Sequence, residues 1–337
     1  MMNRIGIILL CVLGSFIPGR SLAQLFPNLG GQRAGISAGS FLKIDISPRS
    51  AAMSGAQLAL PGDGYSAYWN PGAMTSVKSL TVSASSVLLP SGLNQSYAAL
   101  IKPSKDGDQA WSFSAMGLSA GEMIRRTEFM PEGTGETFYA GYASSGIGYS
   151  RRLTDMFSFG VSLRYVGEYL ENFAMHTAVA DLGFLYTTDF KDLRFAVGLQ
   201  NFGTDSRLRG PINTSGFADR SIQTDPYAMP AVFRMGISMV PLKTEAWSLL
   251  TTVQVDHPGD NAANIRMGVE GAFKNLLFLR GGWKINVKDQ WIPTAGIGVK
   301  SRMGKHPLLV DYGIEPHQRL GIIQRMGLSF VFNSESR

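Results

Sequence analysis

The sequence predicts an all-β protein, an antiparallel transmembrane β-barrel of about 14 strands with an N-terminal plug segment inside the barrel. The first observation is a two-residue alternation. In residues 157–166, FSFGVSLRYV, bulky apolar side chains stand at every second position, with small or charged ones between them. Successive side chains of a strand point to opposite faces, so one face of this strand is apolar. The second observation is that such runs recur along the chain, and the third is that short and long connections alternate.

The composition is consistent with a barrel. Of the 337 residues 45% are hydrophobic and 17% charged, and 39 are glycine. After the first stretch of about twenty residues no apolar run of ~18 occurs, so membrane-spanning helices are excluded. The formal net charge of +6 falls to +4 when Arg4 and Arg20 are removed with the predicted signal peptide. This charge is too small and too scattered to indicate a nucleic-acid partner.

Residues 1–23 have the form of a secretory signal peptide. Arg4 precedes the apolar stretch Ile5–Ile17, and Ser21-Leu22-Ala23 is a small-x-small cleavage site. A retained membrane anchor is the alternative interpretation, disfavoured because the apolar stretch is short. Cys11 is the only cysteine, so the mature chain is expected to contain no disulfide and no thiolate chemistry.

Residues 24–79 are rich in glycine and alanine, and Ala51–Leu60 is a helix-permissive stretch. Small side chains suit close packing in a confined space, which favours a plug in the barrel mouth over a flexible leader. Asn70-Pro71 predicts a turn where the plug ends and the first strand begins, because proline fixes its own φ and pushes the preceding residue toward extended geometry.

This region also resembles a known family. The elements Phe41-Leu42-Lys43-Ile44, Pro48-Arg49-Ser50-Ala51-Ala52-Met53-Ser54-Gly55-Ala56, Asp63 and Tyr68-Trp69-Asn70-Pro71-Gly72-Ala73-Met74 are similar to the N-terminal signature of the PorV/PorQ family. Ser54 stands where glycine is usual, and Gly72-Ala73-Met74 replaces the usual Ala-x-Leu. The plug-motif residues that carry the resemblance are Phe41, Arg49, Met53, Gly55, Asp63, Trp69, Asn70 and Pro71.

The resemblance implies an outer-membrane barrel of the fatty-acid-transporter (FadL-like) type in the type IX secretion system of Bacteroidetes. Its partners would be outer-membrane lipid and either the C-terminal domains of secreted cargo proteins or a cell-surface type IX secretion partner. The implied localisation is the outer membrane of a Gram-negative cell.

Residues 80–332 are predicted to form the barrel and residues 333–337 a C-terminal tail. The fourteen runs begin near Leu80, Gln95, Ala110, Thr137, Met156, Met175, Leu193, Ala231, Trp247, Ala263, Leu276, Thr294, Pro307 and Gly321. Alternate connections between strands lie at opposite ends of a barrel. Every second connection here is short, and the two longest, Gly121–Glu136 and Gly203–Pro230, belong to the other set. Short periplasmic turns and long extracellular loops are typical of outer-membrane barrels.

Enzyme chemistry finds little support in the sequence. Gly117-Leu118-Ser119-Ala120-Gly121 matches G-x-S-x-G, but a long loop follows instead of the helix that a nucleophile elbow needs. The four histidines are scattered, with no metal-ligand spacing. We therefore expect no enzyme activity, no cofactor and no metal.

Charged residues recur at the alternate strand positions whose side chains are predicted to point into the barrel, where they avoid lipid. They either pair with one another and anchor the plug or form a polar pathway for a solute. The predicted lumen charges are Arg164, Asp181, Arg194, Arg234, Asp256, Arg266, Glu270 and Arg280, and Lys284, Lys300, Asp311 and Arg325 share their parity.

Two functions remain open. The main prediction is a type IX secretion component that binds secreted cargo or a surface partner protein through its extracellular loops. The candidate contact residues in or beside the long loops are Phe129, Met130, Phe138, Tyr139, Phe217, Tyr227 and Met229. The alternative is a FadL-like transporter of hydrophobic small molecules, which predicts an apolar pocket between plug and wall near Met53 and Met74.

Overall fold

The structure is a computed structural model that describes residues 37–212, 220–287, 290 and 292–332. The predicted signal peptide at 1–23, the start of the predicted plug at 24–36 and the tail at 333–337 lie outside the described residues. Among the described residues, no helix has both the length and the apolar character needed to cross a bilayer.

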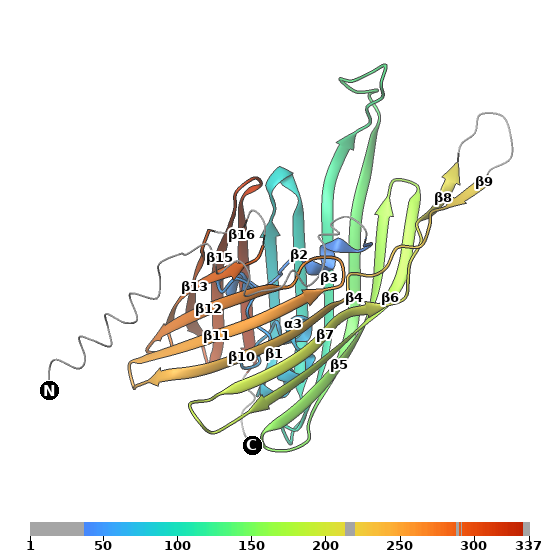
Figure 1. The fold of residues 1–337 in the computed structure, drawn as a ribbon. Coiled ribbons are helices and arrows are strands. Elements are labelled where there is room, and N and C mark those ends of the chain that lie inside the picture. The colour runs from blue at the N-terminus through green and yellow to red at the C-terminus, as the bar shows by residue number, and fades with distance from the viewer. Residues whose placement is uncertain (1–36, 213–219, 288–289, 291, 333–337) are drawn as a thin grey trace, which may run out of the picture.

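Fourteen long antiparallel strands form a closed barrel, as predicted (Figure 1). The strands follow one another around the wall, and β1 pairs with β16 while β5 pairs with β6, which completes the ring. Their bounds are β1 Leu80–Leu88, β2 Asn94–Pro103, β3 Gln109–Ile124, β4 Thr137–Arg152, β5 Phe157–Leu170, β6 Phe173–Thr187, β7 Arg194–Gly203, β10 Val232–Lys243, β11 Trp247–Pro258, β12 Asn264–Phe273, β13 Leu277–Ile285, β14 Thr294–Met303, β15 His306–His317 and β16 Gly321–Phe332.

Two short strands were not predicted. β8 (Arg209–Ile212) and β9 (Arg220–Gln223) pair with each other inside the predicted loop Gly203–Pro230 and splay away from the barrel wall (Figure 1). The sequence pattern missed them because each is only four residues long, which is too short for an alternation to stand out.

The outer face of the wall carries the large apolar side chains. Phe113 and Leu163 remain 55% and 57% exposed, and Phe157 and Phe159 are half-buried beside the buried Ser158 and Gly160 of the opposite face. No second sheet covers this face of β5 in the described part of the chain, so these phenylalanines are placed to contact lipid, as the alternation predicted.

Aromatic pairs lie near those strand ends that are joined by the short turns. The ring centroids of Trp111 and Tyr149 are 4.8 Å apart, and those of Trp247 and Phe273 are 4.6 Å apart. Aromatic girdles mark the membrane interfaces of such barrels. We assign the short-turn end to the periplasm and the end with the longer connections to the outside of the cell.

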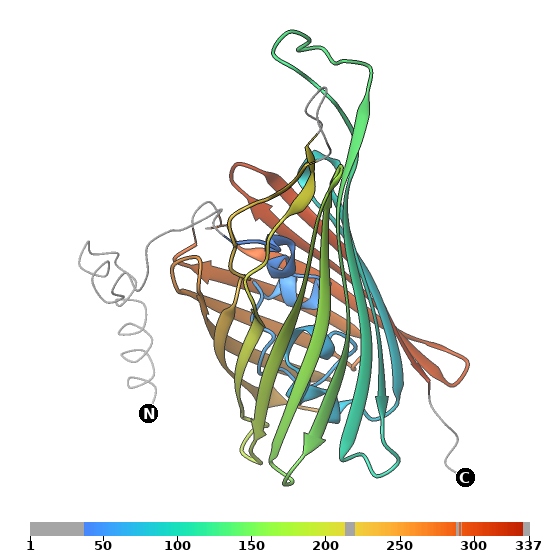
Figure 2. The ribbon, with the colours of Figure 1, turned by 90° about the vertical axis from the view of Figure 1, so that its right-hand side faces the viewer.

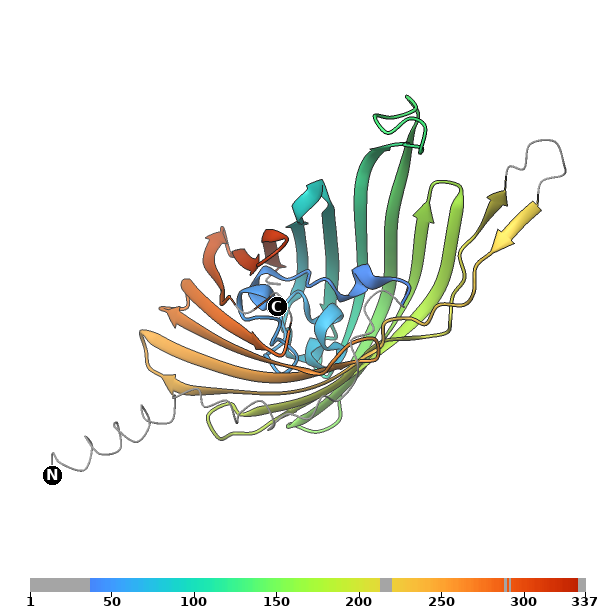
Figure 3. The same cartoon turned by 45° about the horizontal axis from the view of Figure 1, so that its top comes forward.

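The N-terminal segment 37–79 lies inside the barrel and runs along it before β1 begins (Figures 2 and 3). It contains η2 (Ser40–Lys43), α2 (Pro48–Ala52), α3 (Ser66–Trp69) and η3 (Pro71–Ser76), and a further turn, η4 (Pro90–Gly92), joins β1 to β2. Ser47 caps α2, because its side chain accepts a hydrogen bond from the Ser50 amide.

The helix-permissive stretch Ala51–Leu60 is helical only at its start, in Ala51 and Ala52. The helix α2 ends at Ala52, and Ser54 and Gly55 then adopt φ values of 58° and 84°. A residue in the left-handed region ends a helix, so the alanines after this point lie in turns.

The segment rests on glycines of the barrel wall. Gly282 faces the backbone of Met53, and Gly160 faces the backbone of Pro71, so closely that a Cβ atom at either glycine would overlap it. Five other inward glycines lie equally close to the segment: Gly313 faces the backbone of Pro48, and the others face side chains of the segment, namely Gly183, Gly268, Gly296 and Gly327. We call these seven residues the glycine belt. The alternation pattern could not predict these contacts, because they depend on where the segment lies inside the barrel.

Replacing Gly282 by valine should therefore force the segment off the wall. Overpacking of this kind costs about 1–3 kcal/mol, so Gly282→Val should lower the free energy of unfolding by that amount in denaturant titrations in detergent micelles. Gly281→Val is the matched control, because a Cβ there would lie 3.8 Å from its nearest neighbour outside the adjoining residues, an ordinary contact. Equal stability of the two variants would contradict the close packing of the segment.

Candidate functional site

The candidate site is the barrel lumen on both sides of segment 37–79. Its centre is Arg49, whose guanidinium donates to both carboxylate oxygens of Glu270 at 2.8 and 2.7 Å and to Asp63 Oδ2 at 3.2 Å. Arg280 donates to Glu270 Oε2 at 2.6 Å and to Asp311 Oδ1 at 2.5 Å. These five residues form what we call the lower ion network, which ties α2 to β12, β13 and β15.

A second set of charges, the upper ion network, lies nearer the extracellular end. Arg234 Nε and Arg266 Nη2 lie 3.2 and 2.9 Å from Asp256 Oδ2. Lys284 and Arg325 both bind Glu315, with Arg325 Nη2 at 2.8 Å. These two anions hold four cations in place, so the upper network carries a positive excess.

Segment 37–79 contacts this upper network as well. The Arg234 guanidinium lies over the Trp69 ring at 4.7 Å, a cation–π contact. Arg325 Nε donates to the backbone oxygen of Asp45 at 2.7 Å. The charges therefore anchor the segment at two levels of the lumen.

The remaining predicted lumen charges lie on the same inner face. Arg164 forms a two-pronged bond with Asp181, with both distances 2.7 Å, and a further bond to Asn201. Arg194 lies 3.8 Å from Asp192 at the periplasmic end. All eight predicted lumen charges thus form ion pairs. Glu315 was not among the predicted lumen charges. It lies four residues after Asp311 on β15, so the two-residue alternation places its side chain on the same inner face.

The other plug-motif residues hold the segment in shape. Asn70 Nδ2 donates to the carbonyl oxygens of Leu58 and Phe184, and its Oδ1 accepts from the Gly72 amide. Pro71 then opens η3 at the wall of β5. The Phe41 ring lies 5.1 Å from that of Tyr142, and Met53 is fully buried. The turn predicted at Asn70-Pro71 is present, followed by η3 before β1 starts.

A latch joins the segment to the extracellular rim. Ser37 Oγ donates to Asp260 Oδ2 at 2.5 Å, and Lys43 binds the same oxygen. Burial would raise the pKa of the Asp260 carboxyl, but the hydrogen bonds from Lys43 and Ser37 outweigh burial and hold this pKa below its ordinary value. Asp260 lies in a loop, where no sequence pattern marked it.

Two cavities lie at opposite ends of the segment. The extracellular cavity, of about 540 Å³, is bordered by Ile44, Leu89, Val232 and Ile323 and by the upper ion network. The periplasmic cavity, of about 400 Å³, is bordered by Lys78, Thr81, Lys300, Phe278 and the lower ion network. The expected apolar pocket beside Met53 and Met74 is not where the cavities lie, because both methionines pack fully buried against wall and segment.

The predicted contact residues of the long loops divide into two groups. The hairpin of β3 and β4 projects beyond the other strands (Figure 2). It exposes Phe129, Met130 and Tyr139, whereas Phe138 on the same hairpin is half-buried. Tyr227, in the other long loop, is exposed. Met229 is a correction: it is buried in the core with Phe41 and Leu42, because the chain turns back into the barrel mouth before β10. Phe217 lies outside the described residues.

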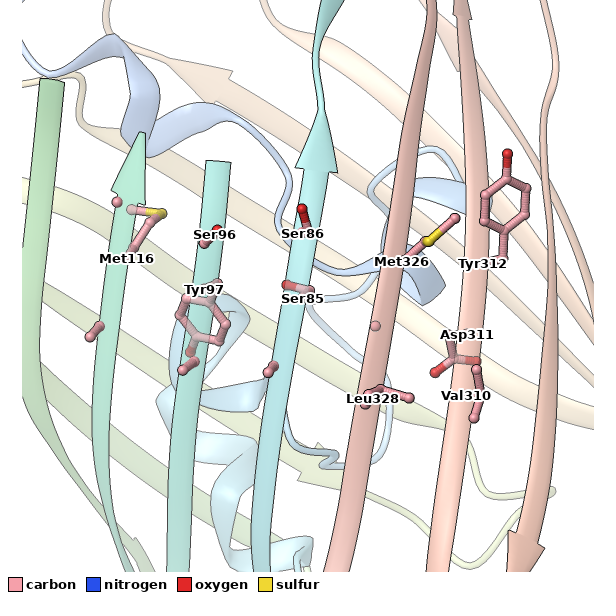
Figure 4. A pocket seen from close by; sticks show the side chains of 15 residues that line it. Ser85, Ser86, Ser96, Tyr97, Met116, Val310, Asp311, Tyr312, Met326 and Leu328 are labelled. Atoms are coloured by element: carbon pink, nitrogen blue, oxygen red, sulfur yellow. The ribbon is translucent and has the colours of Figure 1, made fainter. Parts of the chain in front are cut away.

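A further groove of about 890 Å³ is formed by residues of β15, β16, β1, β2 and β3 (Figure 4). Ala84, Ala98 and Ala115 lie side by side in neighbouring strands, at positions whose side chains point outward from the barrel. The groove therefore belongs in large part to the lipid-facing surface, because small side chains leave the wall hollow there.

No catalytic arrangement surrounds Ser119 in the described residues. It lies within β3, exposed and opposite Asn94 and Gly141, and the strand continues to Ile124 without a helix. The residues that the structure describes contain no group of His, Cys, Asp and Glu side chains that could hold a metal ion.

Neutralising Glu270 should destabilise the protein strongly. Glu270→Gln leaves Arg49 and Arg280 buried without their shared anion, which should cost about 3–5 kcal/mol of unfolding free energy in denaturant titrations. The exposed pair of Lys243 and Asp192 provides the control, since Lys243→Gln should cost under about 1 kcal/mol. Similar losses in both variants would contradict the anchoring role of the lower ion network.

Comparison with known proteins supports the fold. No protein-family model matches the sequence, and no curated protein matches it. The toluene transporter TbuX of Ralstonia pickettii superposes with a TM-score of 0.54 at 11% identity, over 84% of this chain and 96% of its own. The toluene transporter TodX of Pseudomonas putida gives 0.54 at 13% identity over 86% and 99%. The monoaromatic hydrocarbon channel CymD gives 0.52 at 10% identity over 86% and 98%.

These neighbours are FadL-family barrels, and none of the comparisons supports the type IX secretion resemblance. A closed fourteen-strand barrel with an apolar outer face and aromatic side chains near its strand ends belongs in an outer membrane. The chain is an integral outer-membrane protein with a FadL-like fold.

Proposed function

We propose that this protein is an outer-membrane transporter of small hydrophobic or amphiphilic molecules. The observation that carries the proposal is the pair of cavities, one toward the extracellular end and one toward the periplasmic end of the lumen, with segment 37–79 between them. A fourteen-strand barrel is wider than one that its own side chains fill, so moving this segment would join the two cavities into one path.

The extracellular cavity supports the class of molecule. Part of its lining is apolar, with Ile44, Leu89, Val232, Leu320 and Ile323. The upper ion network with its excess of cations lines the same cavity, and the two kinds of residue alternate along the strands: Ile323 pairs with Glu315, and Val232 is two residues from Arg234. A molecule with an apolar body and a polar or anionic end would satisfy both kinds of lining, because apolar atoms leave water and the polar end keeps partners.

The contacts of the segment indicate what transport requires. The lower ion network and the glycine belt fix the segment on the wall, and the hydroxyl oxygens of Ser54 and Thr294 meet at 3.0 Å. Passage past the segment is expected to break such contacts without opening the barrel wall. Transport should then depend on release of the segment from β14.

A disulfide between these positions tests the proposal. In Ser54→Cys/Thr294→Cys, oxidation should lock the segment to the wall. Uptake of radiolabelled toluene and octanoate by cells carrying the variant should fall about tenfold and recover on reduction. Mass spectrometry of the purified barrel would verify the disulfide.

Ser86→Cys/Ser96→Cys is the matched control. These two residues are partners across β1 and β2 on the lipid-facing side of the wall, so this disulfide joins two wall strands away from the segment and uptake should stay unchanged. Full uptake by the locked variant would contradict movement of the segment. Absence of uptake of both probes by the unmodified protein would contradict the transporter itself.

A second candidate function is binding of a protein partner at the cell surface, such as the C-terminal domain of a secreted protein. One observation favours it: the projecting hairpin of β3 and β4 exposes Phe129 at 91% and Met130 at 54%. Exposed aromatic and methionine side chains on a rigid support are typical of contact surfaces.

Replacing residues 126–133 with a short Gly/Ser turn tests this candidate. Loss of a stoichiometric partner from protein purified out of detergent-solubilised host outer membranes, about tenfold by quantitative mass spectrometry, would support partner binding through the hairpin. The same replacement at the periplasmic turn 104–108 is the control. An unchanged set of co-purifying proteins would count against this function.

A further inference from the structure

The barrel wall is incomplete on the extracellular side of β6. β7 ends at Gly203, opposite Val179, whereas β6 continues outward to Phe173. Beyond Val179, the edge of β6 that faces β7 is paired at one position among the described residues, where Ala174 meets Arg209 of β8. The chain after β7 runs beside this edge, and a pocket of about 490 Å³ lies between them, lined by Ala174, His176, Asp205, Ser206, Arg207, Arg209 and Gln223.

The pocket opens on the outer surface of the barrel. Ala174 and His176 have the parity of the lipid-facing Leu182 and Phe184 on β6. A side chain at Gly210 would meet the Phe173 ring, and Phe173 has the inward parity. Arg209, the neighbour of Gly210 in β8, therefore points the other way, to the side of Ala174 and His176.

Aromatic side chains place this pocket at the membrane interface. The exposed Tyr165 and Tyr169 have ring centroids 5.9 and 5.6 Å from the His176 ring, and Tyr165 Oη lies 2.6 Å from His176 Nδ1. Ten residues of β6 separate His176 from Tyr186 at the periplasmic end. At ~3.3 Å per residue and a tilt of roughly 40°, this corresponds to about 25 Å, the height of the apolar band of such barrels.

The chemistry of the pocket favours an anion. Arg207 and Arg209 are exposed, and neither forms a salt bridge within the part of the chain that the structure describes. Asp205 is the one carboxylate among the described lining residues, so the two arginines leave a positive excess. Guanidinium groups bind phosphate oxygens in a two-pronged geometry, and basic side chains at the interface attract anionic lipid headgroups.

We propose that this pocket binds the phosphate of an anionic lipid of the outer leaflet. Arg207 and Arg209 hold the phosphate, Gln223 and His176 border it, and the lipid tails lie against the outer face of β6. The bound lipid would cover the edge of β6 that lacks a partner strand in the described part of the chain. The site is separate from the lumen and does not depend on the transport proposal.

Lipid retention tests the site. The full-length mature protein is placed in nanodiscs of phosphatidylcholine containing lipid A, a phosphorylated glycolipid, and the lipid that remains bound after transfer to detergent is counted by native mass spectrometry. Arg207→Gln/Arg209→Gln should retain about tenfold less lipid A than the unmodified protein. Arg207→Lys/Arg209→Lys should retain an intermediate amount, because lysine keeps the charge but loses the two-pronged geometry.

Arg126→Gln/Arg302→Gln removes two exposed arginines elsewhere and is the matched control, with retention expected to stay unchanged. Heat-modifiability on gels shows that each variant is folded. Equal retention by Arg207→Gln/Arg209→Gln and the unmodified protein would overturn the proposal. Full displacement of lipid A by inorganic phosphate would overturn the lipid as the source of the anion, and equal retention of dephosphorylated lipid A would overturn the phosphate as its recognised group.

Discussion

The structure depends on close contact between segment 37–79 and the glycine belt of the barrel wall. Fourteen strands enclose more space than their inward side chains fill, and this segment occupies the space. Its backbone reaches the wall at Met53 and Pro71 only because Gly282 and Gly160 have no side chains. The wall is therefore shaped to the segment on several sides of the barrel, not at one point of attachment.

The ion pairs act on top of this packing. A charge buried in the lumen is costly unless it is paired, and Arg49 meets Glu270 and Asp63 while Arg164 meets Asp181. Arg49 with Glu270 and Lys43 with Asp260 join the segment to the barrel, so these charges help to define where the segment sits. This arrangement explains how a lumen with many charges can still be closed at its centre.

Much of the fold could be predicted because a strand that faces lipid has a strict two-residue pattern. The same parity was sufficient to assign Arg234, Asp256 and Glu270 to the lumen from the amino-acid sequence alone. The pattern carried no information where backbone conformation decides, as at Ser54, which ends α2, or where a loop folds inward, as at Met229. Asp260 could not be found, because its importance comes from Lys43 and Ser37, which are distant in the chain.

The seam between β1 and β16 has a consequence for biogenesis. Ser83 and Ser329 meet across it although 246 positions separate them, so the ring can close only when the last strand is available. Segment 37–79 immediately precedes β1 and ends up surrounded by the wall. The segment is therefore synthesised before every strand that surrounds it. Its contacts with the glycine belt, which lie on β5, β6 and β12 to β16, are complete only when those strands from both halves of the chain are in place.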